Sequence, residues 1–87
     1  MDTMIKTGSL ESSDCMIELR AADQREIEID SIVFEQFGEQ IHAVITHVLD
    51  QYQVDQLHVR CIDKGALDYT IQARLKAALD LWGEQNG

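Results

Sequence analysis

The chain has 87 residues, of which 45% are hydrophobic and 26% are charged, and its formal net charge is −9. These values are typical of one soluble globular domain with a single modest core. The acidic balance argues against nucleic-acid binding, because that function needs cations to neutralise phosphates. No run approaches the roughly 18–20 apolar residues of a membrane span. The N-terminus shows no secretory signal, so a cytoplasmic location is expected.

Two short stretches in the first third of the chain alternate between apolar and polar residues. Residues 1–13 are polar and weakly patterned, and could form either a flexible arm or one side of a loose hairpin. In Cys15–Arg20 and again in Glu26–Asp30, apolar residues occupy every second position, which is typical of half-buried strands. The short polar connection between these two strands predicts an antiparallel hairpin.

An apolar stripe at steps of three and four residues follows the second strand and predicts a helix of about five turns. Its members are Phe34, Phe37, Ile41, Val44, Ile45, Val48, Leu49 and Tyr52. Ser31 precedes the stripe at the position of an N-cap. Gly38 lies inside this helix, where glycine costs about 1 kcal/mol relative to alanine.

The last third of the chain predicts one more strand and one more helix. Leu57–Ile62 alternates again, and the cluster Asp63-Lys64-Gly65 predicts a turn. A second helical stripe then contains Leu67, Ile71, Leu75, Ala78, Leu79 and Trp82. Asp68 falls in the first turn, where a negative charge suits the helix dipole, and Gly83 is expected to end the helix.

The order strand, strand, helix, strand, helix predicts an α+β two-layer sandwich, with an antiparallel sheet and both helices on one face. The core is predicted to form between the inward sheet residues and the apolar faces of the helices. The residues assigned to it are Ile17, Leu19, Ile27, Ile29, Leu57 and Val59 from the sheet, and Phe37, Ile41, Val48, Leu75 and Leu79 from the helices.

The segment Gly8-Ser9-Leu10-Glu11-Ser12-Ser13-Asp14-Cys15-Met16-Ile17 is a short polar turn that opens into the first alternating strand. Its order of residues resembles the prosthetic-group attachment segment of the citrate lyase acyl carrier protein family, the gamma chain of that enzyme. Later stretches resemble the family in the same order, namely Phe37-Gly38, Asp63–Asp68 and Ala73-Arg74-Leu75. In the family a serine directly after the Leu-Glu pair carries the prosthetic group, and the matching residue is Ser12.

The resemblance implies a carrier subunit that performs no catalysis alone. Ser12 would carry a 2'-(5''-phosphoribosyl)-3'-dephospho-CoA arm through a phosphodiester, placed there by a dedicated transferase. The citrate lyase alpha subunit would exchange acetyl for citrate on the thiol of the arm. The beta subunit, which uses magnesium, would cleave the citryl thioester, so that citrate yields oxaloacetate and acetate. Residues 1–13 would be a flexible N-terminal segment with the attachment loop, and residues 14–87 a single α+β acyl carrier domain.

Glu11 and Asp14 flank the matching serine, and the resemblance gives these charges a possible role. Like-charge repulsion would keep the anionic phosphodiester of the arm in water. Without the resemblance, Ser12 and Ser13 would be interpreted as ordinary turn residues. The charged residues of Asp63–Asp68 are interpreted as capping and solvated groups, with a docking surface for partner subunits as the alternative.

Two other functions remain open. The acyl carrier of malonate decarboxylase uses a related arm on a related fold, although the glutamate before Ser12 and the stretch Asp63–Asp68 favour citrate lyase. A small unmodified interaction module with a ferredoxin-like sandwich would instead bind a partner through its open sheet face.

Asp30-Ser31-Ile32 resembles the aspartate–serine–leucine motif at which ordinary acyl carrier proteins take phosphopantetheine. In that family the motif opens the second helix of an all-helical bundle. Two alternating strands precede it here, so the interpretation of Ser31 as an N-cap is preferred.

The cysteines and histidines predict neither a metal site nor a catalytic site. Cys15 and Cys61 are 46 positions apart, which is no metal or redox spacing, and both are interpreted as small buried apolar residues. His42 and His47 are five residues apart and do not share a helix face, unlike the i, i+4 pair of a metal-binding helix. His58 is predicted on the outward face of a strand.

Overall fold

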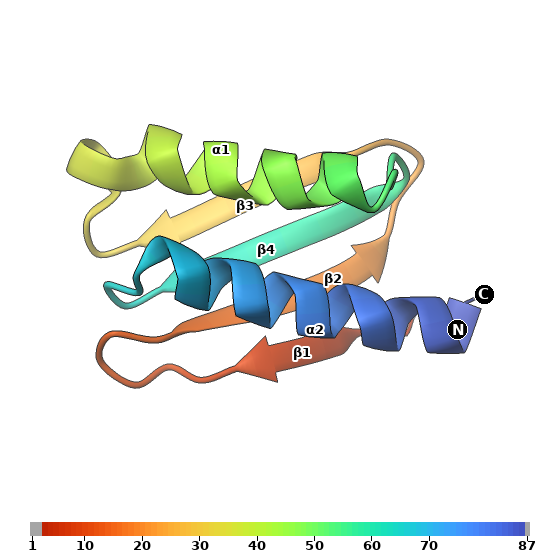
Figure 1. Cartoon of the computed structure of the whole chain (residues 1–87), viewed down its shortest axis with the longest axis horizontal. Helices are drawn as coiled ribbons and strands as arrows, with labels where there is room; N and C mark the ends of the chain where they lie inside the picture. The colour runs from red at the N-terminus through yellow and green to blue at the C-terminus, as the bar shows by residue number, and fades with distance from the viewer. Residues whose placement is uncertain (1–2, 87) are drawn as a thin grey trace.

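Residues 3–86 are described by a computed structural model, in which two helices cover one face of a four-stranded sheet (Figure 1). In chain order the elements are β1 (Ile5–Gly8), β2 (Cys15–Ala21), β3 (Glu26–Ser31), α1 (Phe34–Gln51), β4 (Leu57–Asp63) and α2 (Asp68–Asn86). The predicted α+β class with two helices is confirmed. In this part of the chain, neither helix is long and apolar enough to cross a membrane.

The strand order in the sheet is β1-β2-β4-β3, which corrects two details of the prediction. β2 and β3 do not form a hairpin, because β4 lies between them, antiparallel to β2 and parallel to β3. The sheet is therefore mixed rather than antiparallel. Helix α1 connects β3 to β4, and a helical crossover of this kind is the usual way to join parallel neighbours.

β1 is an additional strand that the predicted order omits. Its four residues pair antiparallel with β2, with Ile5 opposite Leu19 and Gly8 opposite Met16. Only Ile5 among them is buried, so the stretch is too short to show an alternating pattern. Residues 1–13 were predicted to form either a flexible arm or one side of a hairpin, and Ile5–Gly8 forms one side of a hairpin with β2. Residues 1 and 2 of that segment, and residue 87 at the other end, lie outside the described residues.

Most of the predicted core is confirmed. The buried members are Ile17, Leu19, Ile41, Val48, Leu57, Val59, Leu75 and Leu79. Ile27 and Ile29 are only half-buried because β3 is an edge strand. The prediction that Phe37 belongs to the core is wrong, since this residue is 48% exposed. It lies in the first turn of α1, which projects beyond the end of β3 (Figure 1).

Both predicted helix boundaries need correction. Ser31 is the last residue of β3, not an N-cap, and α1 begins at Phe34 after Val33 without a side-chain cap. Gly83 does not end the second helix, because α2 continues to Asn86. The presence of glycine at position 38 inside α1 is explained by the ring of Phe34, since a Cβ at this position would lie 2.9 Å from that side chain.

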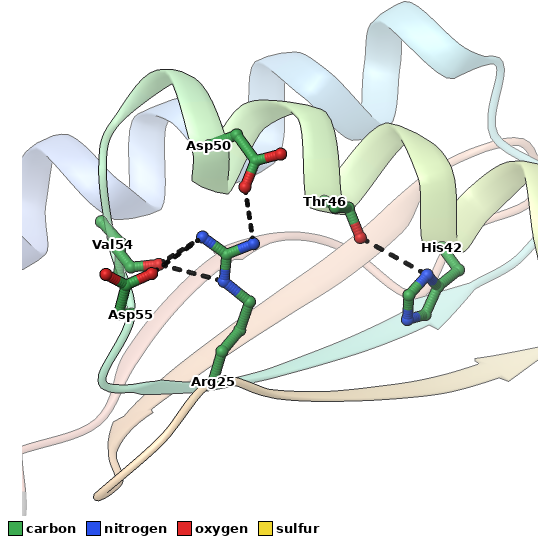
Figure 2. A network of polar contacts seen from close by, with 6 residues as sticks. All are labelled: Arg25, His42, Thr46, Asp50, Val54 and Asp55. Atoms are coloured by element: carbon green, nitrogen blue, oxygen red, sulfur yellow. Dashed lines mark hydrogen bonds and ion pairs between the residues drawn. The ribbon is translucent and has the colours of Figure 1, made fainter.

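At one end of the sheet, a single arginine joins two connections that are distant in the sequence (Figure 2). Arg25, between β2 and β3, donates hydrogen bonds from Nε and Nη2 to the carbonyl oxygen of Val54, at 3.0 and 2.7 Å. Its Nη1 donates to Asp50 at 2.7 Å, and Nη2 lies 3.4 Å from Asp55. We call this set the Arg25 clamp. It fastens the β2–β3 connection to the end of α1 and the connection that follows.

Candidate functional site

Ser12 lies in the connection Ser9–Asp14 between β1 and β2, which we call the Ser12 loop. The loop is at the end of the sheet opposite the Arg25 clamp, beside the β3–α1 and β4–α2 connections (Figure 1). Three connections that are far apart in the sequence therefore meet at the end that carries the predicted attachment residue.

Backbone geometry closes the Ser12 loop tightly. Gly8 has a φ of 86°, and a Cβ there would overlap the carbonyl oxygen of Cys15, so only glycine fits. The Ser9 N–H donates to that same carbonyl at 3.2 Å, and the Asp14 N–H donates to the Glu11 carbonyl at 3.1 Å. The second bond closes a β-turn with Ser12 and Ser13 at its centre. Ser13 adopts a φ of 66°, a left-handed conformation that is uncommon for serine.

Ser12 is exposed at the tip of this turn. In residues 3–86, none of the hydrogen bonds found involves its hydroxyl. The neighbouring Ser13 N–H donates to the Lys64 carbonyl at 2.8 Å, which holds the turn against the β4–α2 connection. The Ser12 hydroxyl is therefore accessible from solvent while the backbone beside it is anchored.

Asp14 anchors the base of the loop instead of facing the solvent. Arg74 of α2 donates to both carboxylate oxygens, at 3.0 and 2.9 Å. The Ser9 hydroxyl and the Cys15 N–H also donate to this carboxylate, each at 2.7 Å. These contacts, with Arg74 the largest, hold the pKa of Asp14 well below its usual range. Glu11 and Asp14 were both predicted to repel the phosphodiester of the arm, but only Glu11 is exposed.

A second buried polar link joins the other two connections at this end. The Asp63 carboxylate is 1% exposed, accepts the Ser31 hydroxyl at 2.7 Å and accepts the Ala66 N–H at 2.8 Å. The Ser31 hydroxyl oxygen in turn accepts the Val33 N–H at 3.1 Å. Ser31 is thus half-buried and bonded in a mixed sheet, not in an all-helical bundle, which contradicts the phosphopantetheine interpretation of Asp30-Ser31-Ile32.

A groove of about 640 Å³ lies between the starts of α1 and α2. Its apolar lining includes Phe37, Ile41, Ala66, Leu67 and Tyr69. Sequence reasoning missed this groove because Phe37 and Leu67 were assigned to the buried helical stripes. Their spacing fits those stripes, but both residues are exposed.

The other predicted groups are placed as follows. Cys15 and Cys61 are both buried, as expected, and the neighbouring Cys15 thiol and burial raise the pKa of Cys61. His42 and His47 are exposed on α1. His58 contacts carboxylates of β3 on the open face of the sheet, and residues 3–86 contain no group of three His, Cys, Asp or Glu that could hold a metal ion.

Ion pairs cover the open face of the sheet. Arg60 of β4 lies 3.6 Å from Glu18 of β2 and 3.1 Å from Glu28 of β3. His58 lies 3.0 Å from Glu26 and 3.4 Å from Glu28. This face is therefore a charged surface, unlike the apolar groove at the Ser12 end.

Comparisons with known proteins show the family to which the chain belongs. The family model ACP, described as malonate decarboxylase delta subunit (MdcD), matches residues 2–81. A citrate lyase acyl carrier protein from Haemophilus ducreyi is 49% identical over 72 residues, covering 83% of this chain and 76% of the relative. One from Lactiplantibacillus plantarum is 49% identical over 73 residues, with the same coverage. One from Fusobacterium nucleatum is 41% identical over 88 residues, covering 99% of this chain and 94% of the relative. The chain therefore belongs to the citrate lyase acyl carrier protein family.

Proposed function

We propose that this chain is the acyl carrier subunit of citrate lyase and that Ser12 carries its phosphoribosyl-dephospho-CoA arm. The observation that carries the proposal is the position of Ser12, exposed at the tip of an anchored turn in a chain that is up to 49% identical to citrate lyase acyl carriers. The arm would supply the thiol that bears the acyl group. The chain's own contribution is to present that arm to partner active sites at high effective concentration.

The attachment needs little from the chain itself. The Ser12 oxygen would form a bond to the phosphorus of an activated phosphoribosyl donor, a polyphosphate leaving group would depart, and the hydroxyl proton would pass to a base of the transferase. The serine must therefore be reachable by the transferase. The exposed position of Ser12 fits this condition.

Peptide mass spectrometry after co-expression with the transferase tests the site. Ser12→Ala is expected to fold, to remain unmodified and to fail to support citrate cleavage when assembled with the alpha and beta subunits. Ser13→Ala is the matched control, because it removes the adjacent hydroxyl and keeps the backbone bond to Lys64. An adduct on Ser13 or Ser31 in place of Ser12 would refute the assignment.

The proposed partners are the alpha and beta subunits of citrate lyase, where catalysis would reside, together with the attaching transferase. The proposed location is the cytoplasm, where such a complex would meet citrate. The family model's description as a malonate decarboxylase subunit makes that complex the second candidate. Assembly of the modified chain with the subunits of each complex, followed by citrate cleavage or malonate decarboxylation assays, distinguishes the two candidates.

We also propose that, within residues 3–14, mobility is greatest at Leu10–Ser12, since Ile5–Gly8 pairs with β2 and the Ser13 amide donates to Lys64. Amide hydrogen exchange tests this proposal residue by residue. The Ser12 amide should exchange rapidly, while the Ser13 amide, which donates to Lys64, should be protected. Protection of Ser12 as strong as in the core helices would count against a mobile attachment loop.

A further inference from the structure

Exposed apolar side chains are concentrated at the end of the molecule that carries Ser12. In the described part of the chain, eight large apolar residues are exposed, and only Tyr52 and Leu81 lie away from this end. The other six are Leu10, Ile32, Phe34, Phe37, Leu67 and Tyr69. We call these six residues the Ser12-end surface. Exposed apolar side chains gathered at one end of a small domain commonly mark a binding site.

The groove between α1 and α2 forms a concave part of this surface. Phe37 and Leu67 line it from the two helix starts, and Gln40 of α1 donates to both carboxylate oxygens of Asp68, at 3.0 and 2.8 Å. The buried contacts of Asp63 hold the connections on either side. The groove is therefore preformed, which reduces the entropy that binding would cost.

The groove and Ser12 belong to one connected unit. Lys64 accepts a hydrogen bond from Ser13 through its carbonyl and donates its own N–H to the Asp14 carbonyl at 2.9 Å. The next residues along the chain, Gly65 to Leu67, line the groove. A protein seated in the groove would consequently lie at the same end of the molecule as the Ser12 loop.

The charges at this end favour a basic partner. Glu11 is exposed on the Ser12 loop, Glu35 and Glu39 are exposed on the first two turns of α1, and Asp68 lies on the groove. Lys64 and Arg74 are the cations of these connections and of the first two turns of each helix, and Arg74 is already paired with Asp14. The excess negative charge disfavours the phosphates of an arm folded back on the surface, and it favours a partner rich in lysine or arginine.

We propose that the Ser12-end surface docks the transferase that attaches the arm, with an apolar side chain of the transferase in the groove and cations around it. This inference rests on the proposed function. Phosphoryl transfer requires the transferase to bring its active site within bonding distance of the Ser12 oxygen, whereas enzymes that act on the far end of a long arm need not touch the loop. An enzyme that holds a polyphosphate donor also places cations around its active site, which complements the acidic rim.

Steady-state kinetics of arm attachment test the docking. The variants are Leu67→Ala and Tyr69→Ala in the full chain, with Leu81→Ala, on α2 at the other end, as the matched control. The first two residues are 61% and 68% exposed, so both variants should keep the wild-type melting temperature. We expect each to raise the KM for the carrier at least tenfold with kcat little changed, and the control to stay within twofold of wild type. Raising the salt concentration should increase the wild-type KM.

The outcomes separate this inference from the proposed function. Attachment to Ser12 with an unchanged KM in both groove variants would overturn the docking surface and leave the carrier function intact. Failure of the wild-type chain to accept the arm on Ser12 would overturn the proposed function itself. The amide resonances of Ala66, Leu67 and Tyr69 are then compared in the modified and unmodified chain, each purified away from the transferase. If they shift in the modified chain, the groove holds the arm and the docking proposal is wrong.

Discussion

The two ends of the sheet use polar groups in opposite ways. At one end the Arg25 clamp reaches outward across two connections and ties them together with a guanidinium group (Figure 2). At the Ser12 end the buried Asp63 carboxylate joins two connections from inside, and Asp14 bonds to Arg74 of α2. Apolar side chains therefore remain on the outside at that end, where a partner can reach them.

With the proposed docking surface, this difference would separate stability from binding within 87 residues. The Arg25 clamp joins the β2–β3 connection to the end of α1 and to the connection that follows. The inward anchors instead fix the backbone of three connections while leaving Ser12 and the groove exposed. Substitutions at the two ends and in the core between them should accordingly have distinct effects.

The largest expected effect distinguishes the core from the Ser12 end. Leu75 is fully buried on α2, so Leu75→Ala should lower the free energy of unfolding by about 2–5 kcal/mol. Phe37 carries a larger side chain but is 48% exposed, so Phe37→Ala should cost less than Leu75→Ala. Urea denaturation of the two variants measures both values. A larger loss for Phe37→Ala would show that this end is part of the core and not a binding surface.

The next effect concerns the inward anchor of the Ser12 end. Asp63→Ala leaves the Ser31 hydroxyl and the Ala66 N–H without their buried acceptor, and we expect a loss of roughly 2–4 kcal/mol in unfolding free energy. Asp63→Asn keeps a carbonyl oxygen for one donor and should lose less. Both values come from urea denaturation. Equal stability of Asp63→Ala and wild type would mean that this buried carboxylate does not hold the connections.

A smaller effect is expected from the clamp at the opposite end. Arg25→Ala removes two hydrogen bonds to the Val54 carbonyl and ion pairs with two exposed aspartates, and should cost about 1–2 kcal/mol. Arg25→Lys restores the charge but not the paired donors, so it should recover only part of the loss. Thermal unfolding ranks the three proteins. Attachment of the arm to Ser12 should be unchanged in both variants, since the clamp lies at the other end.

The elements that the sequence predicted well are those with a repeated local pattern. Strands β2, β3 and β4 alternate, and both helices carry apolar stripes, so their positions follow from the sequence. The pairing of strands does not follow, because a period of two fixes which face is buried and not which strand is the neighbour. β1 offers a single buried residue, Ile5, and so has no pattern to detect.

The candidate site was found by a different route. Ser12 came from the family resemblance, since its turn has no physical feature that distinguishes it from other polar turns. The supports of that turn were hidden because they join distant positions, with Arg74 60 residues from Asp14 and Asp63 32 residues from Ser31. Local sequence patterns do not encode contacts of this range.

The smallest predicted effect is a pH dependence of stability at the Ser12 end. Arg74 holds the pKa of Asp14 below its usual range. A depressed folded-state pKa means that the contact stabilises the fold fully above the unfolded value of about 3.9, and that this contribution disappears as the pH falls toward the folded-state pKa. Asp14→Asn removes the titrating group, so wild type should exceed this variant in stability at pH 7 and lose part of that advantage near pH 3. Urea denaturation at both pH values measures the two differences. If the advantage of the wild type were the same at pH 3 as at pH 7, the Asp14–Arg74 contact would not be the anchor of the Ser12 loop.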